Sequence, residues 1–281
     1  MRVAVTGASG FCGSAVARLA AATGDEVICC GRRPGPVGEH RRWDAAADAP
    51  DLSGVDAVIH LAAAVGDASG DPVFRAVNVD GARRLLDAAR GQPVIWVSSA
   101  SVYSPGPYPE PVREDHPTGG QRSAYGRTKA AGEALAIEAG AVVLRPRAVY
   151  GPGDPHLLPR LSRVVRGGRA WLPGPDVPMS LTAVGTLAQA CVAALRDGWP
   201  AGPYNIADPV VYRRDDVVRA VLGAPVRHVP VALAKAVATA SRSRVLTRYA
   251  VDQLTDGMVL ETSKAAALGF RPPSSLRPDG V

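Results

Sequence analysis

The sequence predicts an α/β protein, with a doubly wound parallel sheet followed by a smaller, mostly helical C-terminal lobe. Short apolar segments rich in β-branched residues alternate with helical patterns through the first half of the chain. Such alternation indicates right-handed βαβ units and a parallel sheet. The strand segments are continuous apolar runs, which is typical of a sheet covered on both faces. Beyond about residue 150, helical patterns dominate.

The apolar pattern sets the expected boundaries of each element. Strands are expected at 2–6, 26–30, 41–43, 57–60, 94–97 and 142–144. Helices are expected near 12–22, 79–90 and 123–139. In the second half, short strands are expected near 180–182 and 203–206. Turn-rich stretches without an apolar period cover 104–122, 151–159 and 171–178.

A glycine-rich turn follows the first strand. Residues 7–13 read Gly-Ala-Ser-Gly-Phe-Cys-Gly and lead directly into a helical pattern. Glycines permit a tight turn and let the backbone approach a pyrophosphate, while the helix N-terminus supplies free N–H groups and the positive end of its dipole. Three glycines at this spacing are weak evidence alone. Their position directly after the first strand is what predicts a dinucleotide site.

Tyr125 and Lys129 form a Tyr-x-x-x-Lys pair on the helix expected near 123–139. Only three of the 32 Lys and Arg residues are lysines, and there are seven tyrosines, so this spacing is rare by chance. Residues four apart share a helix face, and a nearby cation lowers a tyrosine pKa. The pair therefore indicates a tyrosine that exchanges a proton near neutral pH. Taken alone, it is equally compatible with an exposed helix face carrying a solvated lysine.

Several motifs together resemble the short-chain dehydrogenase/reductase superfamily, in particular its extended branch, the NAD-dependent epimerase/dehydratases. They occur in the family's order over nearly the whole chain. They are Gly-x-x-Gly-x-x-Gly at 7–13, Asp-Ala-Val-Ile-His-Leu-Ala-Ala at 56–63, Asn-Val-Asp-Gly at 78–81, Val-Ser-Ser-Ala-Ser-Val-Tyr at 97–103, Tyr-x-x-x-Lys at 125–129, Leu-Arg-Pro-Arg-Ala-Val-Tyr-Gly-Pro-Gly at 144–153, and Glu-Thr-Ser-Lys-Ala at 261–265. The resemblance implies a Rossmann domain over 1–150, and a substrate-binding lobe over 151–281 with some elements returning to the first domain.

The resemblance also implies roles for individual residues. Tyr125 would be the general acid in ketone reduction and the base in alcohol oxidation, Lys129 would bind the nicotinamide ribose, and Ser99 would position the substrate oxygen. Alternation along a strand places Ser101 on the same face as Ser99, so Ser101 is the second candidate. The cofactor would contact Gly7, Ser9, Gly10, Phe11, Cys12, Gly13, Asp44, Leu61, Ala62, Ala63, Tyr125, Lys129, Pro146, Ala148 and Val149.

The residues after the second strand favour NADP(H) as the cofactor. An acidic residue there would bind the ribose 2′-hydroxyl of NAD, whereas arginine accommodates the 2′-phosphate of NADP. This chain has Gly31-Arg32-Arg33 and no acidic residue. Arginine pairs bidentately with phosphate, so Arg32 and Arg33 are the expected phosphate ligands. Two solvated loop arginines are the alternative.

Departures from the family pattern bear on the substrate. Sugar 4,6-dehydratases carry an acidic pair after the catalytic Ser/Thr, where this chain has Ala100-Ser101. Nucleotide-sugar epimerases usually place an arginine at the position of Met179, and an acidic residue at the position of Thr186. The C-terminal segment is more similar to the hydroxysteroid dehydrogenase and dihydroflavonol reductase-like groups.

The expected function is therefore an NADPH-dependent ketoreductase or alcohol dehydrogenase acting on a small, largely apolar organic substrate. A nucleotide-sugar epimerase or 4-ketoreductase is the first alternative, since Arg145, Arg147 and Arg160 could serve a phosphate. A non-catalytic NADP(H)-binding regulator is the second. His116 and His156 lie in candidate substrate loops and are expected to be ordinary polar loop residues.

Composition argues against nucleic-acid binding, membrane anchoring and metal binding. The net charge is +6, but the arginines are scattered and only 5% of residues are aromatic, so nucleic-acid binding is not expected. No apolar run is long enough to span a membrane, and the nucleotide-binding strand begins at Met1, so neither a membrane anchor nor a signal peptide is expected. The four cysteines lack metal-ligand spacing. We expect a cytoplasmic, metal-free monomer or homodimer with reduced cysteines.

Overall fold

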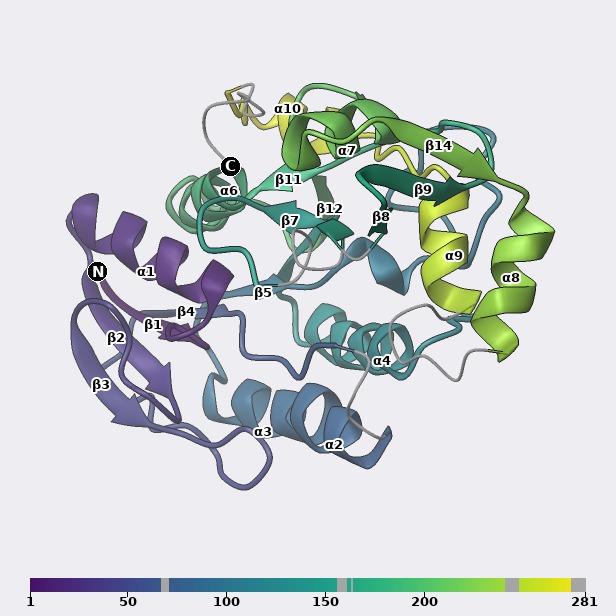
Figure 1. The fold of residues 1–281 in the computed structure, drawn as a ribbon. Coiled ribbons are helices and arrows are strands. Elements are labelled where there is room, and N and C mark those ends of the chain that lie inside the picture. The colour runs from purple at the N-terminus through teal and green to yellow at the C-terminus, as the bar shows by residue number, and fades with distance from the viewer. Residues whose placement is uncertain (67–70, 156–160, 163, 241–247, 274–281) are drawn as a thin grey trace.

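A seven-stranded parallel sheet forms the centre of the computed structural model, which describes residues 1–66, 71–155, 161–162, 164–240 and 248–273 (Figure 1). The strand order is β12-β6-β5-β4-β1-β2-β3, and every neighbouring pair is parallel. The strands are β1 (Arg2–Thr6), β2 (Glu26–Gly31), β3 (Glu39–Arg42), β4 (Ala57–His60), β5 (Val94–Val97), β6 (Val142–Pro146) and β12 (Gly202–Ile206). The order reverses between β1 and β4, and open α/β sheets bind ligands outside the carboxyl ends of strands at such a switch point.

Helices cover both faces of this sheet. Helices α1 (Phe11–Ala22) and α6 (Val184–Arg196) pack together on one face, and α3 (Gly81–Ala88) and α4 (Ala124–Glu138) lie on the other (Figure 1). Side chains alternate along β1 accordingly: Val3 and Val5 belong to the core on the α1 side, and Ala4 to the core on the α3 side. This arrangement confirms the predicted α/β class.

The strands predicted in the first 150 residues and near 203–206 agree with the structure, and so do the three predicted helices. The strand predicted near 180–182 is wrong, because residues 180 and 181 separate two shorter strands at Pro178–Met179 and Thr182–Ala183. Strands β1, β4 and β5 have the predicted bounds, and α1 and α4 lie where expected, with the Ser123 hydroxyl capping α4 by accepting a hydrogen bond from the Gly126 amide. Strand β3 begins two residues earlier than predicted.

The helix predicted over 79–90 is present, but the helical run begins earlier than expected. Three consecutive helical pieces cover residues 71–88: α2 (Asp71–Arg75), a π-helical segment (Ala76–Asp80) and α3. An added Cβ on Gly132 of α4 would overlap the Asn78 carbonyl oxygen, so the π-helical segment and α4 are in direct contact. Tertiary packing of this kind is not visible in local periodicity.

The second half of the chain contains more strands than predicted. Short strands β7 (Val149–Tyr150), β8 (Val165–Arg166), β9 (Arg169–Pro173), β10 (Pro178–Met179), β11 (Thr182–Ala183), β13 (Tyr212–Arg213) and β14 (Val226–Val229) accompany helices α7 (Arg214–Leu222), α8 (Val231–Ala240), α9 (Arg248–Thr255) and α10 (Ser263–Ala267). The turn predicted over 171–178 is wrong for its first residues, which belong to β9. That strand forms because it pairs in parallel with the distant β14.

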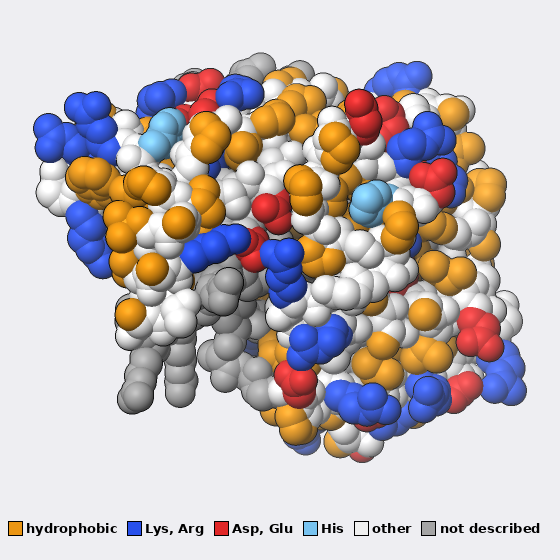
Figure 2. All heavy atoms as spheres, turned by 90° about the vertical axis from the view of Figure 1, so that its right-hand side faces the viewer, with side chains coloured by type: hydrophobic (Ala, Val, Ile, Leu, Met, Phe, Trp, Pro, Cys, Tyr) orange, Lys and Arg blue, Asp and Glu red, His pale blue; other side chains and the backbone are white. Residues whose placement is uncertain are grey.

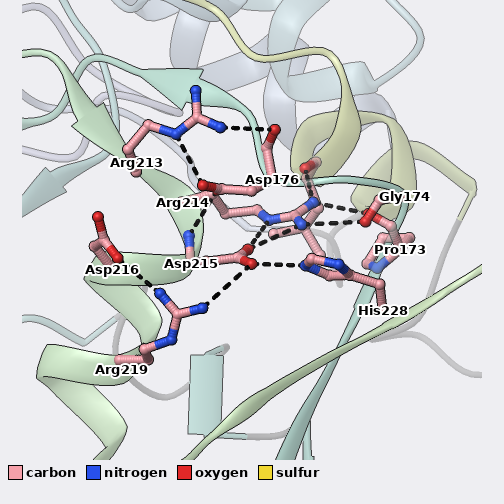
Figure 3. Close-up of polar contacts among 10 residues, drawn as sticks. Pro173, Gly174, Asp176, Arg213, Arg214, Asp215, Asp216, Arg219 and His228 are labelled. Atoms are coloured by element: carbon pink, nitrogen blue, oxygen red, sulfur yellow. Dashed lines mark hydrogen bonds and ion pairs between the residues drawn. The ribbon is translucent and has the colours of Figure 1, made fainter.

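A buried arginine holds this lobe together (Figure 3). Arg214, at the start of α7, is only 1% exposed. It donates hydrogen bonds to the carbonyl oxygens of Pro173 and Leu254, both at 2.7 Å, and to the carboxylate of Asp215 at 3.0 Å. His228 of β14 approaches the same carboxylate at 2.6 Å. A buried charge is tolerated when it is paired and hydrogen-bonded in this way, so we interpret this cluster as structural.

Candidate active site

The glycine turn lies at the switch point of the sheet. Gly7 has φ of +67°, and a Cβ there would come within 2.9 Å of the Ala62 backbone. The Thr6 hydroxyl accepts hydrogen bonds from the Leu61 and Ala62 amides at 3.1 Å each, and lies 2.8 Å from Nδ1 of His60. The turn and the segment after β4 are therefore locked together at the carboxyl ends of β1 and β4.

The turn offers backbone donors to an anion. Gly10 is the N-cap residue of α1 and provides no side-chain cap, so the first amides of the helix keep their donor capacity. The helix dipole places positive charge at the same point. These features of the chain fit the pyrophosphate of a dinucleotide.

Arg32 and Arg33 lie exposed just past β2, beside this turn. The Gly7 amide donates to the Cys30 carbonyl at 3.0 Å, which joins the end of β2 to the turn. Neither arginine forms an ion pair with any residue that the structure describes. Asp44, after β3, is half-buried, and its carboxylate accepts a hydrogen bond from the Ala46 amide at 3.0 Å.

A sharp bend after β6 brings the Pro146–Val149 stretch to the same edge. Ala148 has φ of +47°, which is unusual for a residue with a side chain and marks backbone strain. After the bend, β7 pairs with β11. An ideal Cβ on Gly151 would lie 3.9 Å from the Phe11 ring at the start of α1. This segment and the glycine turn are thus neighbours in space.

Lys129 is buried at the centre of these elements. Its side chain crosses from α4 to the end of β5, where Nζ donates to the Val97 carbonyl at 2.8 Å. Burial lowers the pKa of the Lys129 ammonium to about 8, and nearby Glu133 and Cys12 act in the opposite direction. The lysine is therefore a fixed cation at the end of β5, and Ser99 follows two residues after its partner Val97.

Tyr125 lies one helical turn before Lys129 and is half-buried, with its ring edge-on to Phe74 at 6.4 Å between centroids. The structure thus places the tyrosine and lysine on one helix face. Ser99 begins a 3-10 turn (Ala100–Val102), and its hydroxyl accepts a hydrogen bond from the Ser101 amide at 3.2 Å. The argument that placed Ser101 on the face of Ser99 is wrong, because β5 ends at Val97.

Asn78 was not assigned a role from the sequence, yet it joins three parts of the site. It is buried in the π-helical segment, and its amide exchanges hydrogen bonds with the backbone of Ala64 at 2.8 and 3.1 Å. It also donates to the Thr128 hydroxyl at 3.1 Å, between Tyr125 and Lys129. A buried amide inside an apolar helical pattern is the signal that could have identified it.

Two of the three arginines considered for a substrate phosphate have internal partners. Arg145 is buried against Glu133 at 2.6 Å, and buried Arg147 donates to the Ser180 carbonyl at 2.9 Å. Arg160 and His156 lie outside the described residues. His116 is half-buried, with ring centroids 5.7 Å from Tyr103 and 5.8 Å from Tyr108.

An acidic group does reach the start of α6, although the sequence has Thr186 there. The buried carboxylate of Asp208 accepts hydrogen bonds from the Ala183 amide at 2.9 Å and the Thr186 hydroxyl at 3.0 Å. The hydroxyl of Tyr150 donates to the same carboxylate at 2.6 Å. A residue distant in sequence thus supplies the negative charge at this helix N-terminus.

Among the described residues, no helix is both long and apolar enough to cross a bilayer, and no group of three or more His, Cys, Asp or Glu side chains could hold a metal.

On the face shown in Figure 2, most Lys and Arg side chains lie scattered among acidic and apolar ones.

Comparison with known proteins agrees with this geometry. The sequence model of the NAD dependent epimerase/dehydratase family matches residues 3–207. The chain is 32% identical, over 62% of its length, to a 2-alkyl-3-oxoalkanoate reductase from Stenotrophomonas maltophilia, and 35% identical, over 57%, to a dTDP-4-dehydrorhamnose reductase from Streptomyces griseus. These alignments span 58% and 54% of the relatives. The solved structure of MoeE5 in complex with UDP-glucose and NAD matches 100% of this chain and 96% of its own, with a TM-score of 0.76 and 26% identity.

Proposed function

Because the chain belongs to the NAD dependent epimerase/dehydratase family, the extended short-chain dehydrogenase/reductases, we propose that it is an NADPH-dependent ketoreductase of a small, largely apolar organic substrate. The observation that carries this proposal is the Tyr125–Lys129 pair, with Lys129 buried against the end of β5, where it binds the carbonyl of Val97, two residues before Ser99. A pair that was merely a solvated helix face would leave the lysine exposed.

In the proposed carbonyl reduction, each of the site residues has a separate role. Bound NADPH supplies the hydride. Ser99 orients the carbonyl oxygen, and Tyr125 gives it a proton as negative charge develops there. The Lys129 cation lowers the pKa of the phenol, which makes that transfer easier at neutral pH. The amides at the start of α1 hold the pyrophosphate, and Arg32 and Arg33 bind the 2′-phosphate.

The partners of two arginines support the proposed substrate class. Arg145 and Arg147 are engaged inside the protein, and Met179 occupies the position where epimerases usually carry an arginine. These two arginines are thus poorly placed for a nucleotide diphosphate. The similarity to a 2-alkyl-3-oxoalkanoate reductase supports a ketone with an apolar chain.

A nucleotide-sugar epimerase or 4-ketoreductase is the second candidate. It is favoured by the full-length match to a structure in complex with UDP-glucose and by the similarity to a dTDP-4-dehydrorhamnose reductase. Denaturing freshly purified protein and identifying the released nucleotide by mass separates the two. An epimerase regenerates its cofactor and retains it, so stoichiometric NAD would overturn the ketoreductase proposal.

Turnover tests the proposal directly. NADPH consumption is followed with a panel of 3-oxoacids and their esters and, separately, with nucleotide 4-ketosugars. Tyr125→Phe is expected to lower kcat on the active substrate by about 10²- to 10⁴-fold and to leave NADPH affinity nearly unchanged. Tyr204→Phe, which removes only a hydrogen bond to the Pro200 carbonyl, is the matched control. A fully active Tyr125→Phe would refute the assignment, and NADPH binding without turnover of any substrate would favour the non-catalytic regulator.

A further inference from the structure

A buried polar cluster begins one helical turn after Lys129 and reaches the residue before Ser99. We call Ser98, Glu133 and Arg145 the Glu133 cluster. Glu133 is 2% exposed and Arg145 is 3% exposed. Arg145 donates to Oε1 of Glu133 from Nη2 at 2.6 Å and from Nε at 3.1 Å, and the Ser98 hydroxyl donates to Oε2. Both carboxylate oxygens are therefore occupied, and the carboxylate is held in one orientation.

This cluster adds a second hydrogen bond between α4 and the end of β5. Lys129 reaches the Val97 carbonyl, and one helical turn later Glu133 receives the hydroxyl of Ser98. The next residue is Ser99. The two attachments thus fix the helix that carries Tyr125 relative to the segment that leads into Ser99. Arg145 fastens the carboxylate to β6, whose Leu144 carbonyl accepts a hydrogen bond from the Ser98 amide at 2.7 Å.

The negative charge of Glu133 also acts on the Lys129 ammonium. Besides Tyr125, the titratable groups whose charge bears on Lys129 are Glu133 on the same helix, Cys12 on α1 and His60 on β4, with Asp154 acting on Cys12. Burial lowers the pKa of His60 to about 3 and raises that of Cys12 to about 11, so both are neutral at pH 7. Glu133 remains as the anion that acts on the lysine. Without it, burial alone would favour loss of the Lys129 proton.

We propose that Glu133, held by Arg145 and Ser98, is a positioning residue that keeps Lys129 cationic at neutral pH and keeps α4 in register with Ser99. This inference rests on the proposed function of the Tyr125–Lys129 pair. Glu133 acts through Lys129 and the helix rather than on the substrate.

The small number of lysines makes the charge effect directly measurable. With lysine side chains isotope-labelled, NMR titration follows only Lys129, Lys235 and Lys264, and Lys129→Arg assigns the first. Glu133→Gln is expected to lower the titration midpoint of Lys129 by about one pH unit or more. Glu133→Asp, which keeps the charge, is expected to restore most of it. Lys235 and Lys264 report on the same sample and are expected to stay unchanged.

In kinetic assays, Glu133→Gln is expected to lower kcat at neutral pH and to displace the pH profile of kcat, with KM little changed. If Glu133→Gln does not fold because it leaves Arg145 buried without its partner, Glu133→Gln/Arg145→Met removes both charges, a change that proteins often tolerate. The Lys129 midpoint is again expected to fall.

An unchanged titration midpoint of Lys129 in either folded variant overturns the proposal. An equal loss of thermal stability in Glu133→Gln and Glu133→Asp, with the Lys129 midpoint unchanged, overturns it as well. The titration needs neither cofactor nor substrate. A displaced midpoint in a protein that reduces no ketone would therefore count against the proposed function and not against the role of Glu133.

Discussion

Gly132 provides a test of how α4 packs, because it is a glycine in the middle of the helix that carries Tyr125 and Lys129. An ideal Cβ there would overlap the carbonyl oxygen of Asn78 and lie 3.4 Å from the Trp96 ring. The oxygen is backbone, so Gly132→Ala must shift the π-helical segment. Overpacking of this kind costs about 1–3 kcal/mol, whereas alanine gains about 1 kcal/mol of helix propensity over glycine. We expect a net loss of up to about 2 kcal/mol.

Gly185→Ala is the matched control. Gly185 also lies in an α-helix, α6, but an added Cβ would meet nothing within 4 Å. The same substitution there should be neutral or stabilise by up to about 1 kcal/mol. Urea unfolding, followed by tryptophan fluorescence, measures both variants, and an unchanged slope with a displaced midpoint shows that stability alone has changed.

Opposite signs for the two glycines are the expected result. Because Asn78 also contacts Ala64 and Thr128, Gly132→Ala should lower turnover along with stability. A Gly132→Ala protein as stable as Gly185→Ala would show that α4 and the π-helical segment are not in contact as described.

Two other predictions concern charge. The double variant Arg32→Ala/Arg33→Ala should weaken NADPH binding by about 10- to 100-fold and leave NADH binding nearly unchanged. Arg90→Ala, which removes another exposed arginine, is the control. An equal effect on both cofactors would contradict the assignment of Arg32 and Arg33 to the 2′-phosphate. Burial lowers the pKa of His60 from 6.5 to about 3, so the unfolded state binds more protons between these values and stability should fall as pH drops from 6.5. His60→Gln should flatten that part of the pH–stability curve, and an unchanged slope would mean that His60 is not the group responsible.

Local patterns in the sequence determined much of the sheet and the candidate catalytic pair. The glycine turn after β1 and the Tyr125–Lys129 spacing depend only on neighbours along the chain, and apolar runs mark buried strands wherever they occur. The predicted and observed bounds of β1, β4 and β5 agree for that reason.

Only the tertiary structure decided which partner each buried polar group has. Arg145 looked available for a phosphate, but folding pairs it with Glu133, and Asp208 supplies the acid that the start of α6 lacks in sequence. The helical run that contains the predicted helix begins earlier than expected, with a π-helical segment where Asn78 meets α4, and residues 171–173 become a strand because β14 lies beside them. A buried charge or carbonyl must find a partner, and that partner is chosen by distance in space, which local periodicity does not encode.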